Sequence, residues 1–235
     1  MRRSLTVTSP QPWTPISLKN GHPCIIVQCS TPEEGTDGLK FPFFPVLDRH
    51  VAQHNLTVID PHDGLELHLQ AGNPFERPLP FTLRLSSLLI RGNFEELRKD
   101  DVGTLMTLLA QVQIGTPSNL YERRLEMQMK DISEQDLGVR LEGIEHQEVP
   151  GDQGPAIPFE SFLQQLTGND PGFKPQRLGK VLGEFVVEPR FANKLIIAVP
   201  PTNLGGDGYI VHHFTQGVEN LAIGGYTVVV PPMNF

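Results

Sequence analysis

Apolar and polar residues alternate along much of this chain with the period of two that half-buried β-strands show. The segments 65–69 (LELHL) and 81–85 (FTLRL) place an apolar residue at every second position. Strand-forming residues are denser still in the last quarter, where proline or glycine bounds the runs 183–189, 194–201, 208–214 and 225–232. The pattern predicts a mainly β protein.

Two segments have helical spacing instead. Residues 101–113 carry apolar side chains three and four positions apart, and Asn93 followed by Glu96 forms a capping-box pattern upstream. Residues 158–167 (PFESFLQQLT) begin with a proline at the first turn and are followed by Gly168, a residue type that often ends helices. We therefore expect two helices, which makes the fold class α+β.

The order of the predicted elements fits two architectures. The favoured one is a β-sandwich or barrel-like core that carries the two helices. The alternative covers 81–187, where the order strand, helix, strand, strand, helix, strand resembles a ferredoxin-like βαββαβ unit, with β-hairpins added outside it. In both cases we expect one domain over 1–235, with a subdivision into an N-terminal β-hairpin region (1–78), an α+β centre (79–190) and a C-terminal β region (191–235).

Charge is unevenly distributed and argues against nucleic acid as a partner. The formal net charge is −8, and residues 93–152 contain thirteen acidic and six basic side chains. Such a field repels phosphate backbones, and no cluster of lysine and arginine interleaved with aromatic residues offsets it. We interpret the acidic segment as a solvated face, with a docking surface for a basic partner as the alternative.

The cysteines and the amino-terminal residues bear on the compartment. Cys24 and Cys29 lie in one predicted strand, on opposite faces and about 16 Å apart, which excludes a disulfide between them. The start MRR is not followed by the apolar run of a signal peptide, and no stretch reaches the roughly 18 to 20 apolar residues of a membrane helix. We expect a cytoplasmic protein, or part of a particle assembled in the cytoplasm, without a membrane span.

The segment 60–70 (DPHDGLELHLQ) is the strongest chemical signal in the chain. Its turn residues at 60–64 and its alternating leucines predict a hairpin over 55–70. Glu66 and His68 would then share one face about 7 Å apart, with His62 at the tip as a third conceivable metal ligand. The same pattern is typical of any half-solvated strand, so we expect no metal and no cofactor. The neighbouring His212 and His213 would face opposite sides of a strand and could not chelate together.

No catalytic motif identifies a reaction. Gly-x-Ser-x-Gly, Gly-x-x-x-x-Gly-Lys, His-Glu-x-x-His and Cys-x-x-Cys are all absent from the sequence. We therefore assign no catalytic residue and favour a non-enzymatic structural or interaction subunit of a larger assembly, such as a virion, tail or secretion-type machine. Two alternatives remain: a ferredoxin-like subunit of an RNA-guided complex, and an enzyme with dispersed catalytic residues.

The carboxyl-terminal segment YTVVVPPMNF supplies the predicted interface. Valines occupy both faces of a strand here, and Pro231 and Pro232 cannot donate ladder hydrogen bonds, so strand pairing should stop at Val230. The apolar tail beyond it needs cover from a neighbour or from its own domain. We predict contact with protein subunits of the same assembly, a homo-oligomer included, through Val228, Val229, Val230, Met233 and Phe235.

Overall fold

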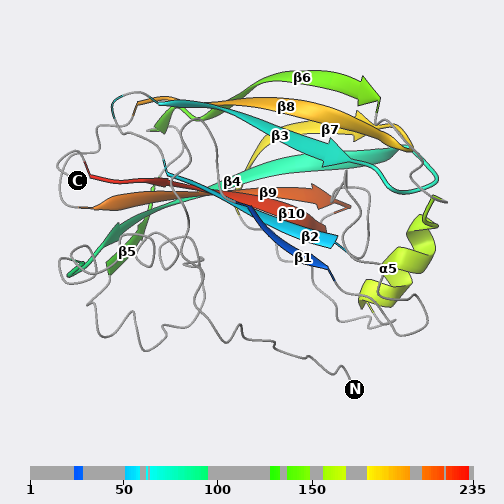
Figure 1. Ribbon diagram of the computed structural model, residues 1–235, viewed down its shortest axis with the longest axis horizontal. Helices are drawn as coiled ribbons and strands as arrows, with labels where there is room; N and C mark the ends of the chain where they lie inside the picture. The colour runs from blue at the N-terminus through cyan, green and yellow to red at the C-terminus, as the bar shows by residue number, and fades with distance from the viewer. Residues whose placement is uncertain are drawn as a thin grey trace.

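The computed structural model describes residues 24–28, 51–58, 62, 64–94, 128–132, 137–148, 156–167, 179–201, 208–219 and 221–232. Within these ranges the protein is mainly β, as the alternating pattern predicts. Its strands form two sheets, one of seven strands and one of three, and most neighbouring strands are antiparallel. Figure 1 shows the three-stranded sheet lying over one side of the larger sheet.

The larger sheet has the order β1-β2-β10-β9-β4-β5, with β7 also paired to β4. The strands β2 and β10 are parallel, and the other pairs are antiparallel. The strands are β1 (Cys24–Gln28), β2 (Val51–Val58), β4 (Leu79–Arg91), β5 (Gln128–Asp131), β7 (Lys180–Val187), β9 (Tyr209–Val218) and β10 (Leu221–Val230).

The smaller sheet has the order β3-β8-β6, and it consists of β3 (Leu65–Gly72), β8 (Phe191–Val199) and β6 (Arg140–Glu148). Leu67 and Leu69 of β3 point to the same side as Leu195 and Ile197 of β8. These side chains belong to one hydrophobic core with residues of the larger sheet such as Phe214. The alternation along β3 is therefore what places one face in the core and the other in solvent.

The long strand β4 exchanges partners along its length. Residues 79–85 pair with β7 and residues 88–91 pair with β5, while β9 runs along the opposite edge. Gly179, with φ +78°, brings the chain onto β4, where a Cβ atom would lie 2.1 Å from the carbonyl oxygen of Leu85. Only glycine fits this approach, because both the positive φ and the lack of space exclude a side chain.

The helix predicted at 158–167 is present as α5 (Phe159–Thr167), which lies beside one end of the sheets in Figure 1. Phe159 is buried, and Phe162 and Leu163 pack against the same core. The helix predicted at 101–113 lies outside the described residues. None of the helices in the described ranges has the length and hydropathy that crossing a membrane requires.

The ferredoxin-like alternative is wrong, because its four strands would have to form one sheet. β4, β5 and β7 do share a sheet, but β6 pairs with β8 in the other one. The sequence order of elements does not specify which strand edges meet, and this element order was the reason for considering an RNA-guided complex. Within the described strands the larger sheet is also no closed barrel, since β1 and β5 end its path and are not paired with each other.

The predicted hairpin over 55–70 is also wrong. β2 pairs with β1 and β10 in the larger sheet, whereas β3 pairs with β8 in the smaller one. Gly64 adopts φ +68°, which suits a turn, but this turn leads the chain from one sheet to the other. Turn residues identify a change of direction and carry no information about the partner of the next strand.

Two buried asparagines connect the sheets where β7 ends. The side-chain amide of Asn73, which follows β3, donates to the carbonyl oxygens of Arg77 and Val187, both at 2.8 Å. Its Oδ1 atom accepts from the backbone N–H of Phe75 at 3.0 Å. Asn193 of β8 donates from Nδ2 to the carbonyl oxygen of Val186 at 3.1 Å. The last two carbonyl groups of β7 thus receive donors from residues of the other sheet.

We expect Asn73→Ala to lower the free energy of unfolding by about 2 to 4 kcal/mol, because it leaves buried backbone groups without partners at about 1 to 3 kcal/mol each. Urea denaturation followed by circular dichroism measures this. Asn73→Asp is the matched variant, since it keeps the acceptor for Phe75 and removes both amide donors. A variant Asn73→Asp as stable as the wild type at neutral pH would contradict the role assigned to the donors.

Candidate functional site

The histidine and acids of the segment 60–70 lie on the outer face of the three-stranded sheet. Glu66 and His68 are both exposed and share that face, as predicted, with 2.7 Å between Glu66 Oε1 and His68 Nε2. His62 is exposed in the turn before β3. Within the described ranges, no group of three or more His, Cys, Asp or Glu residues has an arrangement that could hold a metal ion.

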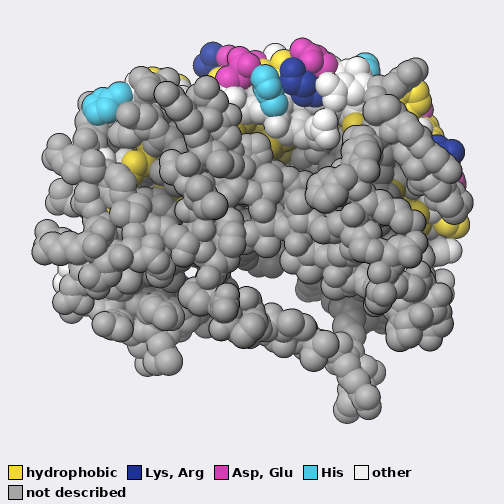
Figure 2. Space-filling view, in the orientation of Figure 1, with side chains coloured by type: hydrophobic (Ala, Val, Ile, Leu, Met, Phe, Trp, Pro, Cys, Tyr) yellow, Lys and Arg dark blue, Asp and Glu magenta, His cyan; other side chains and the backbone are white. Residues whose placement is uncertain are grey.

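Charged residues of both signs cover this outer face. Figure 2 shows acidic, basic and histidine side chains gathered at the top of the molecule, over β6, β8 and β3. Lys194 Nζ lies 3.1 Å from Glu145 Oε2, and Arg140 Nη2 lies 2.7 Å from Glu142 Oε1. These pairs are largely solvated, so each contributes at most about 1 kcal/mol. The arrangement is that of a hydrated sheet surface with balanced local charge.

A buried serine and histidine face each other across two central strands. Ser87 of β4 and His212 of β9 are in register, and 2.9 Å separates Ser87 Oγ from His212 Nδ1. Burial, with a smaller contribution from the neighbouring His213, lowers the pKa of His212 to about 4. The ring is therefore neutral at physiological pH. Both side chains lie below the surface, so this pair joins two strands and does not present a nucleophile to a substrate.

The two adjacent histidines point to opposite faces, as predicted from their positions in a strand. His213 Nδ1 lies 3.0 Å from Thr227 Oγ1 of β10, on the face away from Ser87. Sequence reasoning identified both histidines but missed Ser87 and Thr227. Their role depends on the register between strands, and a single serine or threonine within a strand gives no signal of its partner.

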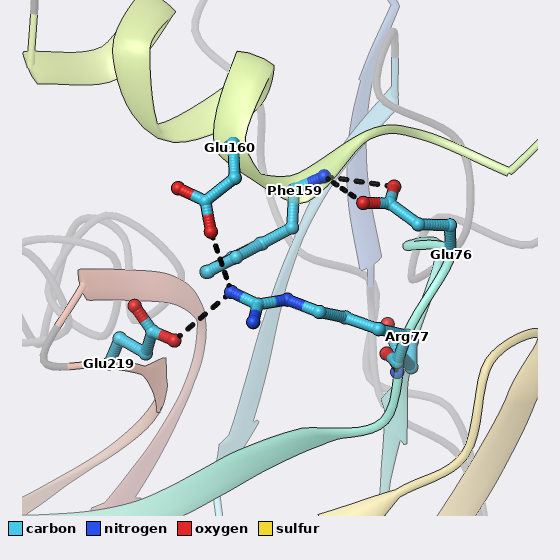
Figure 3. Close-up of polar contacts among 6 residues, drawn as sticks. Glu76, Arg77, Phe159, Glu160 and Glu219 are labelled. Carbon is cyan, nitrogen blue, oxygen red and sulfur yellow. Dashed lines mark hydrogen bonds and ion pairs between the residues drawn. The ribbon is translucent and has the colours of Figure 1, made fainter.

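A second polar cluster holds the start of α5 (Figure 3). Both carboxylate oxygens of Glu76 accept from the backbone N–H of Phe159, at 2.9 and 3.1 Å. A carboxylate at this position satisfies a free donor of the first helical turn and interacts favourably with the helix dipole. Glu76 therefore caps α5 from the β3–β4 connection, which is remote from the helix in sequence.

Arg77 occupies the centre of this cluster. Its Nη2 atom lies 2.9 Å from Glu160 Oε1 and 3.5 Å from Glu219 Oε1, and its guanidinium group lies 5.0 Å from the centre of the Phe159 ring. The arginine thus links α5 to the turn between β9 and β10. Each charged group in this cluster contacts another group of the protein. The charged side chains are exposed to solvent, which limits the energy of their ion pairs.

The predicted interface residues divide into two groups. Val228, Val229 and Val230 are 0%, 0% and 2% exposed within this single chain, so its own residues cover them. β10 ends at Val230 and the two prolines follow outside the strand, as predicted. Contact of these valines with a second subunit stays a prediction. Met233 and Phe235 lie outside the described residues, and their contact with a partner stays a prediction.

Exposed apolar side chains occur instead at the junction of β6, β7 and β8. Val186, Ile144 and Phe191 are 52%, 38% and 38% exposed. Ile144 and Phe191 lie two residues from His146 and Asn193, whose side chains meet at 2.8 Å. Asn193 also donates to the backbone carbonyl of Val186 at 3.1 Å, whereas the Val186 side chain lies on the face of β7 opposite Phe185 and Val187. We call this place the β6–β7 seam, defined by Ile144, His146, Val186, Phe191 and Asn193.

The seam lies between two strand edges. Among the described strands, β6 pairs with β8 alone and β7 pairs with β4 alone, so each has one edge without a ladder partner. Ile144, Glu145 and His146 are consecutive and all exposed, which shows that β6 is open to solvent on both faces here. Sequence reasoning missed the seam, although the consecutive apolar residues Phe185, Val186 and Val187 indicated apolar side chains on both faces of β7.

Neither a protein-family model nor a curated protein matches this chain. Among solved structures, the chain is similar to a family 123 glycoside hydrolase from Clostridium perfringens, studied for glycolipid glycan hydrolysis. The identity is 9% and the TM-score is 0.34; the match covers 76% of this chain and 23% of the hydrolase. This chain thus corresponds to less than a quarter of the hydrolase chain, and a likeness at this TM-score says nothing about its function.

We expect Glu76→Ala to lower the free energy of unfolding by about 1 kcal/mol, because the first turn of α5 loses its charged cap. Thermal and urea unfolding measure this loss. Glu66→Ala is the control, since it removes an exposed glutamate from the outer face and should change stability by no more than about 0.5 kcal/mol. Equal effects of the two substitutions would show that the Glu76 contact with Phe159 does not stabilise the helix.

Proposed function

We propose that this protein is a non-enzymatic structural or interaction subunit of a larger protein assembly, and that it contacts its neighbour through the β6–β7 seam. The observation that carries this proposal is the exposure of three apolar side chains, Ile144, Val186 and Phe191, on the three strands that meet at the Asn193 contacts. Apolar side chains gathered on a surface are typical of protein contact sites, whereas single ones scattered over a surface are ordinary.

The two strand edges at the seam support the same proposal. An edge strand presents unpaired backbone N–H and C=O groups, which makes it a template for a strand from another chain. Natural edges are often protected by charge or by a bulge, and β6 has both, with Glu142 and Glu145 exposed and a register shift between Leu141 and Gly143. These features restrict the partners that fit the edge and act against non-specific aggregation.

The partner that we propose is a second copy of this chain. Most soluble assemblies are built from identical subunits, and a two-fold axis brings the same patch of both copies together. Burial of one valine or isoleucine side chain in such a contact contributes roughly 1.5 to 3 kcal/mol. Because 52% and 38% of Val186 and Ile144 remain exposed, covering both side chains changes a dissociation constant by roughly ten- to a hundredfold.

We expect Val186→Lys to raise the dissociation constant of self-association by about ten- to a hundredfold, because a charge replaces an apolar contact. Light scattering over about a thousandfold range of protein concentration measures this change. Ile223→Lys is the matched control, since Ile223 is a similarly exposed apolar residue on β10, and both β9 and β4 separate that strand from β7.

The proposal predicts that the wild type and Ile223→Lys associate alike and that Val186→Lys associates more weakly. Circular dichroism spectra and melting temperatures must agree among the three proteins, so that a loss of association reports the contact and not the fold. A wild-type mass equal to one chain over the whole concentration range would contradict the proposal, and so would equal weakening by both substitutions.

A further inference from the structure

The Ser87–His212 pair lies in the core, where few groups could stabilise a positive charge on the histidine ring. Ser87 and His212 are on the face of the large sheet that also carries Leu85 and Phe214. The centre of the His212 ring is 6.5 Å from that of Phe214. His212 Nδ1 contacts Ser87 Oγ, and its Nε2 atom has no hydrogen-bond partner among the described residues. One side of the ring is therefore bound, and the other is buried without a hydrogen-bond partner in the described part of the chain.

Protonation changes what this site requires. A neutral imidazole has one N–H donor, whereas an imidazolium has two and carries a full charge. Ser87 Oγ can accept from Nδ1–H, but a second donor at Nε2 would have no acceptor in the described part of the core. A buried, uncompensated charge with an unmet donor is among the most destabilising features that a core can contain. Water must reach Nε2 for the charged form to exist.

The charged groups around His212 do not offset this. Its register neighbours, Ser87 on β4 and Val228 on β10, carry no charge. On β4, Arg84 lies on the other face, where it donates to the carbonyl of Gly179, and Arg91 is exposed at the end of the strand. The core faces of β3 and β8 carry uncharged side chains, among them Leu67, Leu69, Leu195 and Ile197. The neighbouring His213 opposes a charge on His212, because a second imidazolium would repel the first.

We infer that the Ser87–His212 pair makes the central strands β4 and β9 acid-sensitive, so that acidification charges the ring and opens the face on which it is buried. This inference does not depend on the seam or on self-association. β9 lies between β4 and β10 in the middle of the large sheet. Opening at this place therefore affects the core as a whole and is not confined to a loop.

The direction of the effect follows from proton linkage. The pKa of His212 is about 4 in the folded chain, against an ordinary value of 6.5. Above pH 6.5 neither state binds the proton, and the pair has its full stability. As the pH falls from 6.5 to 4, the unfolded chain binds a proton that the folded chain does not. The unfolding equilibrium constant then rises by up to about tenfold per pH unit from this group, and by about 300-fold in all once the pH is well below 4.

The test compares urea unfolding of wild type and His212→Asn at a series of pH values between 7.5 and 4. Asparagine places an amide oxygen where Nδ1 lies, keeps a partner for Ser87 and does not titrate. Below pH 6.5 we expect the unfolding constant of the wild type to rise more steeply than that of the variant. The extra rise should reach about tenfold per pH unit. His68→Asn, the same replacement on the exposed outer face, is the control and should retain the wild-type steepness.

Equal pH dependence of the wild type and His212→Asn would overturn the inference, and so would an equal loss of steepness in His68→Asn. If His212→Asn does not fold, nuclear magnetic resonance of the wild type decides. The ring Cε1–H signal of His212 should keep its neutral position until the pH approaches about 4. A His212 signal that titrates near pH 6.5 in the folded protein would overturn the inference.

Discussion

The architecture depends on how the carbonyl groups at the end of β7 are satisfied. β7 belongs to the large sheet, and β8, the next strand in the chain, belongs to the small sheet. Among the described strands, no backbone ladder joins the two sheets at this place. Buried backbone polar groups without a partner are strongly unfavourable. Asn73 and Asn193, both fully buried, provide side-chain amides to the carbonyls of Val187 and Val186. These two contacts allow sheets of different strand order to pack over one core.

The position of α5 follows from the same connection. Asn73 accepts from Phe75, and Phe75 forms an isolated bridge with Ile157, immediately before the helix. The Phe75 ring then contacts the rings of Phe159 and Phe162. With Phe75 held in this way, Glu76 reaches the first turn of α5 and Arg77 reaches Glu160. A six-residue connection between two strands therefore orients one strand end, one helix start and part of the core.

The sequence predicted strands and their faces more reliably than their partners. The alternation in 65–69 placed the leucines of β3 in the core and Glu66 and His68 in solvent, because period and burial are local properties. The hairpin at 55–70 and the ferredoxin-like order were wrong, because the pairing of β2 with β10 and of β6 with β8 depends on residues far away in the chain. The same reason hid Ser87, Asn193 and the β6–β7 seam. The chemistry of each arises only when two distant strands come into register.

The place of β10 between β2 and β9 has a consequence for how this protein reaches its fold. β2 precedes β10 by well over a hundred residues in the chain and pairs with it, with Asn55 opposite Tyr226. Until β10 is available, β1 and β2 have no link to β9 within the described sheet. Contacts between residues so distant in sequence slow folding, because the intervening chain must be ordered first. The apolar faces of the unfinished sheet are therefore exposed until β10 has been synthesised, which gives chaperones a defined interval in which to act.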